Sequence, residues 1–141
     1  HEVADAIAKM GVRVYLPSRI SFLPSTRIRT SLPLAMAQAG VESLVLMPPS
    51  TNSFNGVMEW RMGLADLVRE GLDRQTALKG ISIEPAKAMG QEESVASLSA
   101  GGSATFVIFD GDPLDPFSEV TFLVAAGDVV YDREKDKDKE N

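Results

Sequence analysis

Apolar residues occur at two different periods along this chain, and the first part of the chain repeats one arrangement twice. In each repeat, apolar residues at helical spacing are followed by a glycine, Gly11 or Gly40, and then by a run rich in apolar and β-branched residues that is typical of a strand. Ser31 is placed to cap the second helix. The predicted helices cover residues 2–10 and 34–39, and the predicted strands cover 12–16 and 43–47. This rhythm predicts a parallel α/β fold.

The helical faces follow from the same spacing. Val3, Ile7 and Met10 share one face of the first helix. The longest helical pattern covers residues 57–70 and ends at Gly71. Its apolar stripe consists of Val57, Trp60, Leu64, Leu67 and Val68.

Two shorter helices are predicted after Gly71. Asp73 is placed to cap the first of them, and the second covers residues 85–89. Met58, Trp60 and Met62 would line a pocket or fill a core, and we favour the core because Met and Trp at such spacings usually pack inside.

The period of the pattern changes from 3.6 to 2 near residue 95. We therefore divide the chain into a helix-and-strand part, residues 1–94, and a β-strand part, residues 95–131. Strands are predicted over 104–109, 120–126 and 129–131, with a hairpin turn at Ala126-Gly127-Asp128. The last ten residues, 132–141, hold five acidic and four basic side chains and no apolar one. We expect a disordered tail there, with a solvated helical extension as the alternative.

Composition narrows the function classes. The hydrophobic fraction of 44% and the charged fraction of 24% are those of a soluble globular protein. A net charge of −6 argues against a nucleic-acid partner, and no apolar run is long enough for a membrane helix. The densest basic group is Arg19, Arg27 and Arg29, in a predicted loop. We favour a solvated loop there over an anion site.

Several catalytic sites are excluded by residue type. There is no cysteine, and the single histidine is His1, so the chain by itself builds neither a Ser-His-Asp triad nor a zinc site. Asp110, Asp112 and Asp115 invite a calcium interpretation, but Thr121 stands where a bidentate Glu is needed. We favour an Asx- and Pro-stabilised turn.

One loop carries a candidate binding site. Ser50, Thr51 and Asn52 directly follow the predicted strand at 43–47, and loops at the carboxyl ends of parallel strands are where α/β proteins bind ligands. These three side chains are candidate substrate contacts, and they are equally suited to satisfying backbone groups around a sharp turn.

Two ordered motifs carry a resemblance to a known family. The segment GLDRQTALKGISIEPAKAMG, residues 71–90, and the segment ASLSAGGSATFVIFDGDPLD, residues 96–115, resemble motifs of the amidohydrolase superfamily at the same spacing, most closely its imidazolonepropionase-like and prolidase-like members. The resemblance extends over residues 57–131. It implies the C-terminal part of a (β/α)8 TIM-type barrel, followed by strands of a small β-sandwich domain.

The implied activity is hydrolysis of non-peptide C–N bonds, in amides or cyclic amides, by a water that a divalent metal activates, most commonly zinc. The resemblance assigns the metal ligands to a His-x-His pair and further residues upstream, and to an Asp after the last barrel strand. This chain has Met47-Pro48-Pro49 where that Asp is expected. The alternative is therefore a catalytically inactive relative that serves as a binding or scaffold protein.

We also expect a small-molecule substrate and a homo-oligomer. Because the chain begins with His1 rather than Met, we expect that processing or truncation has removed the true start. The sequence makes no prediction of localisation.

Overall fold

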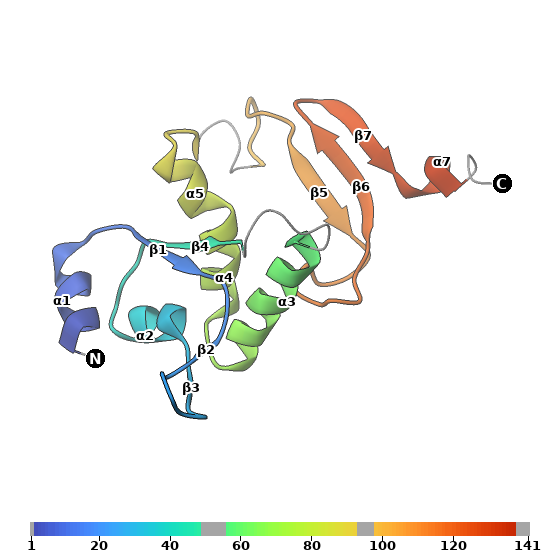
Figure 1. Cartoon of the computed structure of the whole chain (residues 1–141). Helices are drawn as coiled ribbons and strands as arrows, with labels where there is room; N and C mark the ends of the chain where they lie inside the picture. Colours follow the sequence, from blue (N-terminus) through green and yellow to red (C-terminus); the bar gives the residue numbers. More distant parts are fainter. Residues whose placement is uncertain (1, 49–55, 93–97, 138–141) are drawn as a thin grey trace. The chain divides into compact units, whose positions relative to one another are not determined.

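The computed structural model describes residues 2–48, 56–92 and 98–137 (Figure 1). The chain divides into two compact units, His1–Pro85 and Ala86–Asn141, which are described separately. The first unit mixes helices with short strands, and the second is a sheet with a terminal helix. Among the described residues, no helix has both the length and the apolar character needed to cross a membrane.

The first unit contains the predicted helix-and-strand repeats. Its elements are α1 (Glu2–Met10), β1 (Val14–Pro17), β2 (Ser21–Phe22), β3 (Arg29–Thr30), α2 (Leu32–Gln38), β4 (Leu44–Met47), α3 (Gly56–Arg69), α4 (Arg74–Ile81) and α5 (Ile83–Ala88). The last of these crosses the boundary between the units. The predicted elements are present with ends shifted by one or two residues.

Strands β1 and β4 pair in parallel, as the repeated pattern predicts. Leu16 lies opposite Leu46, and Tyr15 lies opposite Val45. Leu44 and Leu46 are 1% exposed, and Leu44 belongs to a core cluster formed with Ala4, Leu16, Met36 and Val41. Because side chains alternate between the faces of a strand, Leu16, Leu44 and Leu46 share the face that the helices cover.

Helix α4 lies directly against β4. A Cβ atom added at Gly80 would stand 2.8 Å from Leu46 Cγ and 3.0 Å from the Leu44 carbonyl oxygen. Asp73 caps this helix as predicted, since its carboxylate accepts a hydrogen bond from the Thr76 amide at 2.8 Å. Ser31 likewise caps α2 and accepts from the Leu34 amide at 3.2 Å.

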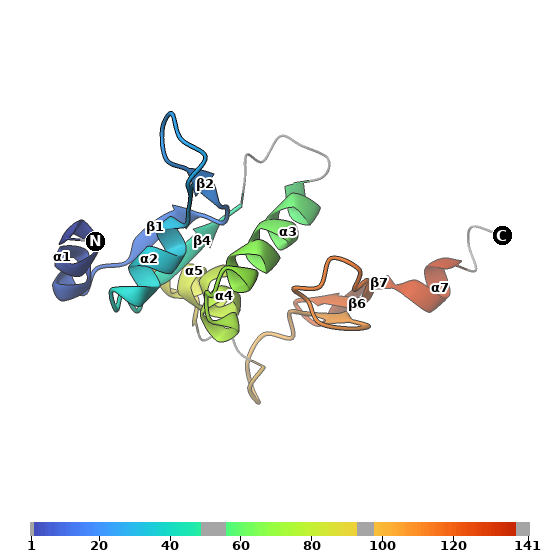
Figure 2. The ribbon, with the colours of Figure 1, turned by 90° about the horizontal axis from the view of Figure 1, so that it is seen from below.

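The segment predicted as a polar loop contains a short antiparallel hairpin. Ser21 pairs with Thr30, and Phe22 pairs with Arg29. Figure 2 shows the β2–β3 hairpin projecting beyond strands β1 and β4 of the same unit. The Leu23 amide donates to the Ile28 carbonyl at 3.0 Å, which extends the pairing toward the turn. A pattern this short carries no strand signal of its own.

Several positions predicted to be buried are exposed instead. In α1 the packed residues are Ala4, Ile7 and Ala8, whereas Val3 and Met10 are 70% and 69% exposed. In α3, Leu64 and Leu67 are fully buried, but Val57 is 71% exposed. Met58 and Met62 are also half exposed, so the predicted core cluster is wrong for these two. Each helix buries a narrower stripe than its apolar residues allow.

The second unit is a three-stranded antiparallel sheet in the order β5-β6-β7. The strands are β5 (Phe106–Phe109), β6 (Val120–Ala125) and β7 (Asp128–Asp132). Ala126 and Gly127 form the predicted hairpin turn, with φ of 51° and 90°. Positive φ at both turn positions is the geometry whose twist matches the flanking strands, and Gly127 adopts it without steric cost.

The charged end of the chain begins with a helix. Arg133–Lys137 form α7, as in the alternative of a helical extension, and residues 138–141 of the predicted disordered tail lie outside the described residues. Arg133 anchors the helix through ion pairs with Asp110, at 2.8 Å, and Glu119, at 3.0 Å. The Glu134 amide also donates to the Asp132 carboxylate at 3.2 Å. Charge composition alone does not reveal the partners of Arg133, because Asp110 and Glu119 lie far away in sequence.

Candidate functional site at the carboxyl ends of β1 and β4

Parallel strands end at the same edge of a sheet, and Ser18 joins the two ends here. The Ser18 amide donates to the Met47 carbonyl oxygen at 3.1 Å, and the Ser18 hydroxyl donates to the same oxygen at 2.9 Å. Ser18 is 3% exposed. Two hydrogen bonds that are shielded from water therefore hold the carboxyl ends of β1 and β4 together.

Helix α3 packs onto this edge at a glycine. A Cβ atom added at Gly63 would stand 2.1 Å from the Ser18 carbonyl oxygen, so only glycine permits the contact. Sequence reasoning missed Ser18 and Gly63 as parts of the edge. A glycine inside a strong helical pattern was the one signal that pointed to a close backbone approach.

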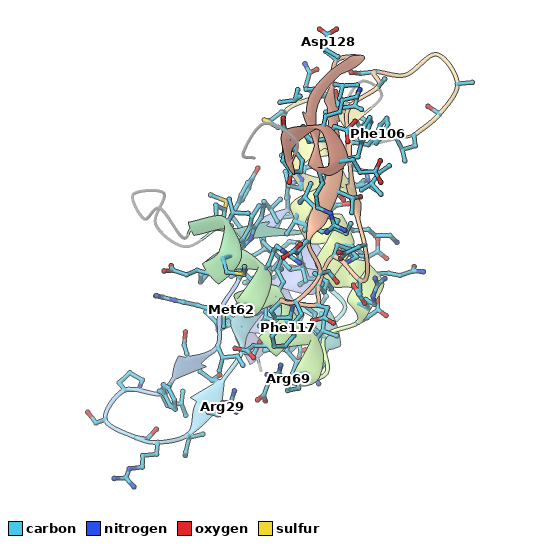
Figure 3. The ribbon with its side chains drawn as sticks, turned by 90° about the vertical axis from the view of Figure 1, so that its right-hand side faces the viewer. Arg29, Met62, Arg69, Phe106, Phe117 and Asp128 are labelled. Atoms are coloured by element: carbon cyan, nitrogen blue, oxygen red, sulfur yellow. The ribbon has the colours of Figure 1, made fainter. Side chains whose placement is uncertain are left out.

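Trp60 lies one turn before Leu64 on the buried stripe of α3. Its indole N–H is buried, and it has no hydrogen-bond partner among the residues that the structure describes. Met62 is half exposed on the same helix, where Figure 3 labels it. The amino-terminal half of α3 thus combines the buried indole N–H of Trp60 with exposed methionine side chains.

The sequence-predicted binding residues Ser50, Thr51 and Asn52 lie outside the described residues. Pro48, which stands where a metal-ligating Asp is expected, is described and exposed. A proline side chain has neither a metal-ligating atom nor a group that exchanges a proton. No set of three or more His, Asp or Glu side chains that suits a metal ion occurs in the described parts of the chain. The donors present at this edge therefore do not fit a zinc ion by themselves.

The predicted basic group does not come together as one site. Arg29 pairs with Glu70 at 3.0 Å, which connects the β2–β3 hairpin to the end of α3. Figure 3 shows Arg29 on this hairpin, and Arg19 and Arg27 are exposed. The Arg29 side chain is 55% exposed and that of Glu70 is 36% exposed, so the ion pair contributes little stability.

The predicted turn in the second unit is confirmed. The Asp112 carboxylate accepts from the Leu114 amide at 2.9 Å, and the Asp115 carboxylate accepts from the Phe117 amide at 3.0 Å. The hydrogen bond from the Glu119 amide, followed by that from Arg133, holds the pKa of Asp110 below its ordinary value. Each carboxylate thus stabilises local backbone or α7, which is a structural role.

Comparison with known proteins identifies the fold. No protein-family model matches the chain, and no curated protein matches its sequence. Among solved structures, the crystal structure of an amidohydrolase from Thermotoga maritima MSB8 matches 94% of this chain with a TM-score of 0.69 and 22% sequence identity. The match covers 34% of that protein, so this chain spans about a third of its length. This chain therefore shares the fold of about a third of that solved protein.

Proposed function

We propose that this chain is the C-terminal part of an amidohydrolase-related protein whose intact form hydrolyses non-peptide C–N bonds in small amides or cyclic amides. The observation that carries the proposal is the fold match, which extends over nearly the whole chain. The two sequence motifs at residues 71–90 and 96–115 support it independently, because they resemble amidohydrolase motifs in the same order.

In this proposal the first unit contributes the last strands and helices of a (β/α)8 barrel. Parallel sheets are usually covered on both faces, and here helices cover one face of the β1–β4 pair. On the other face, Val45 is only 3% exposed, but Tyr15 is 55% exposed and Met47 is 45% exposed. In a closed barrel this face would line the interior, where side chains from the other strands would cover it. Strands β5–β7 would belong to a small β-sandwich.

The metal of this proposal, most commonly zinc, would be bound by residues outside this chain. When bound, such an ion acts as a Lewis acid and activates a water molecule for attack on the C–N bond. The groups of this chain have a different task. Ser18 fixes the strand ends at the edge where barrel enzymes carry their sites, and Gly63 allows α3 to support that edge.

Pro48 favours a second candidate function. Without a carboxylate after the last strand, the protein lacks the group that the family resemblance assigns to metal ligation and proton transfer. A catalytically inactive relative that keeps the fold for binding or assembly is consistent with this substitution.

An experiment on the intact protein distinguishes the hydrolase from the inactive relative. We expect the enzyme to contain stoichiometric zinc by elemental analysis and to hydrolyse at least one member of a panel of N-acyl amino acids and cyclic amides. Absence of both bound metal and turnover would refute the hydrolase and leave the inactive relative.

A substitution tests the position of Pro48 directly. In a hydrolase that has only lost this group, Pro48→Asp raises metal affinity and turnover, whereas Pro48→Asn supplies a side chain of the same shape without the charge. An increase of about tenfold or more in the Asp variant alone would support an active site at this edge. Equal effects of Asp and Asn would show that the site lies elsewhere.

A further inference from the structure

A cavity of about 340 Å³ opens at the amino ends of β1 and β4, opposite the edge described above. It is lined by the connection that follows α1, including Lys9 and Val12, and by the connection that follows α2, including Glu42 and Ser43. Its volume lies at the lower end of the range for small-molecule sites, on the order of 300–1,000 Å³.

Two opposite charges line this cavity without pairing. Lys9 comes from α1 and Glu42 from the connection after α2, and both side chains are exposed. Neither forms an ion pair or a hydrogen bond within the described ranges 2–48, 56–92 and 98–137. A cation and an anion that line one small cavity but do not meet are complementary to a ligand that carries both charges.

The ends of helices α1 and α2 indicate how a ligand with two charges would be oriented in the cavity. Lys9 occupies the last turn of α1, where its positive charge offsets the negative end of the helix dipole. The last turn of α2 has no basic residue, and Glu42 follows it closely. Glu42 is therefore the partner for an ammonium group and Lys9 the partner for a carboxylate, while the Arg13 guanidinium lies next to Glu42, at Ser43.

The wall behind Glu42 is fixed by a hydrogen-bonded chain. The Ser43 hydroxyl donates to the carboxylate of Glu84, which is only 7% exposed, and accepts from Arg13 Nε at 3.2 Å. Ser43 is thereby held in one orientation, with a buried carboxylate behind it. Because its hydroxyl is bonded to both Arg13 and Glu84, Ser43 is a fixed part of the wall rather than a contact for the ammonium group.

We propose that this cavity binds a small zwitterion, such as a free amino acid, with its ammonium group at Glu42 and its carboxylate at Lys9. The site is distinct from the proposed hydrolytic edge, because it lies at the opposite ends of the same two strands. It therefore holds whether or not the intact protein is a hydrolase.

The test is calorimetric titration of the intact protein with glycine, β-alanine and 4-aminobutyrate, which separate the two charges by increasing lengths. n-Butylammonium and butyrate serve as probes with a single charge. We expect saturable binding of at least one zwitterion, and weaker binding of both single-charge probes. Failure of every zwitterion to saturate, or equal binding of a single-charge probe, would overturn the proposal.

Variants identify the site. Glu42→Gln and Lys9→Gln should each weaken zwitterion binding about five- to tenfold, the loss that a partly exposed charged hydrogen bond predicts. Asp5→Asn and Arg27→Gln make the same changes of net charge at exposed positions outside the cavity and should leave binding unchanged. Thermal melts of all four variants confirm folding. Unchanged affinity in both cavity variants would refute the assignment.

Discussion

Replacing Gly63 by alanine tests the contact between α3 and the edge of β1. The added methyl group would stand 2.1 Å from the Ser18 carbonyl oxygen, far inside van der Waals contact. The obstacle is backbone, so no side-chain rotation removes it. Helix α3 must move away by about 1 Å or more, or Ser18 must move and weaken its two hydrogen bonds to Met47.

The magnitude follows from opposing terms. Overpacking a well-packed interior costs about 1–3 kcal/mol, and weakening the Ser18 hydrogen bonds adds about 1 kcal/mol. Alanine is a better helix former than glycine, which returns about 1 kcal/mol. We therefore expect Gly63→Ala to lower the free energy of unfolding by about 2 kcal/mol.

Urea denaturation of the intact protein, followed by circular dichroism, measures this change. Gly80→Ala is the graded comparison. Its Cβ would stand 2.8 Å from Leu46 Cγ and 3.0 Å from the Leu44 carbonyl oxygen, a smaller overlap than at Gly63, so we expect a loss of about 1 kcal/mol. The double variant Ser18→Ala/Gly63→Ala should show no rescue, because the clash is with the carbonyl oxygen rather than the hydroxyl. A Gly63→Ala protein as stable as the wild type would refute the reasoning.

Three further changes test separate parts of the chain. The hydrogen bonds at the start of α4 lower the pKa of Asp73 below its ordinary 3.8, so the stability that Asp73 contributes should be present above about pH 4 and lost as pH falls further. Asp73→Asn should flatten this part of the pH–stability curve, which thermal melts measure. Arg133→Gln should free Asp110 and Glu119 and speed hydrogen exchange of the Glu119 amide, while unchanged exchange would show that the ion pairs do not hold this turn. Trp60→Phe removes a buried N–H that has no hydrogen-bond partner among the described residues, so the free energy of unfolding, measured by circular dichroism, should change by no more than about 1 kcal/mol. A loss above about 3 kcal/mol would mean that packing of the indole outweighs the cost of this buried donor.

Most helices and strands were predictable because their signals are local. Ser31 and Asp73 cap the helices that they were expected to cap, and Ala126-Gly127 forms the expected turn. Caps and tight turns depend on a few neighbouring residues, so their physics is contained within a short stretch of sequence. The β2–β3 hairpin was missed because two-residue strands leave no periodic pattern.

The candidate edge was less predictable, because it depends on distant partners. Ser18 and Met47 are 29 residues apart, and neither residue type signals that the two are bonded. Met58 and Met62 show the opposite failure: their apolar character predicts burial, yet both are half exposed. An apolar side chain is buried only where another element covers it.

By itself, the amino-acid sequence determined the order and type of most helices and strands, the absence of thiol chemistry, and the absence of histidines other than His1. Those properties follow from composition and from interactions between near neighbours. The tertiary structure alone decided that Gly63 contacts Ser18 and that Lys9 and Glu42 line one cavity. The physical reason is that chain folding brings such groups together through packing, and packing depends on the three-dimensional fit of elements far apart in sequence.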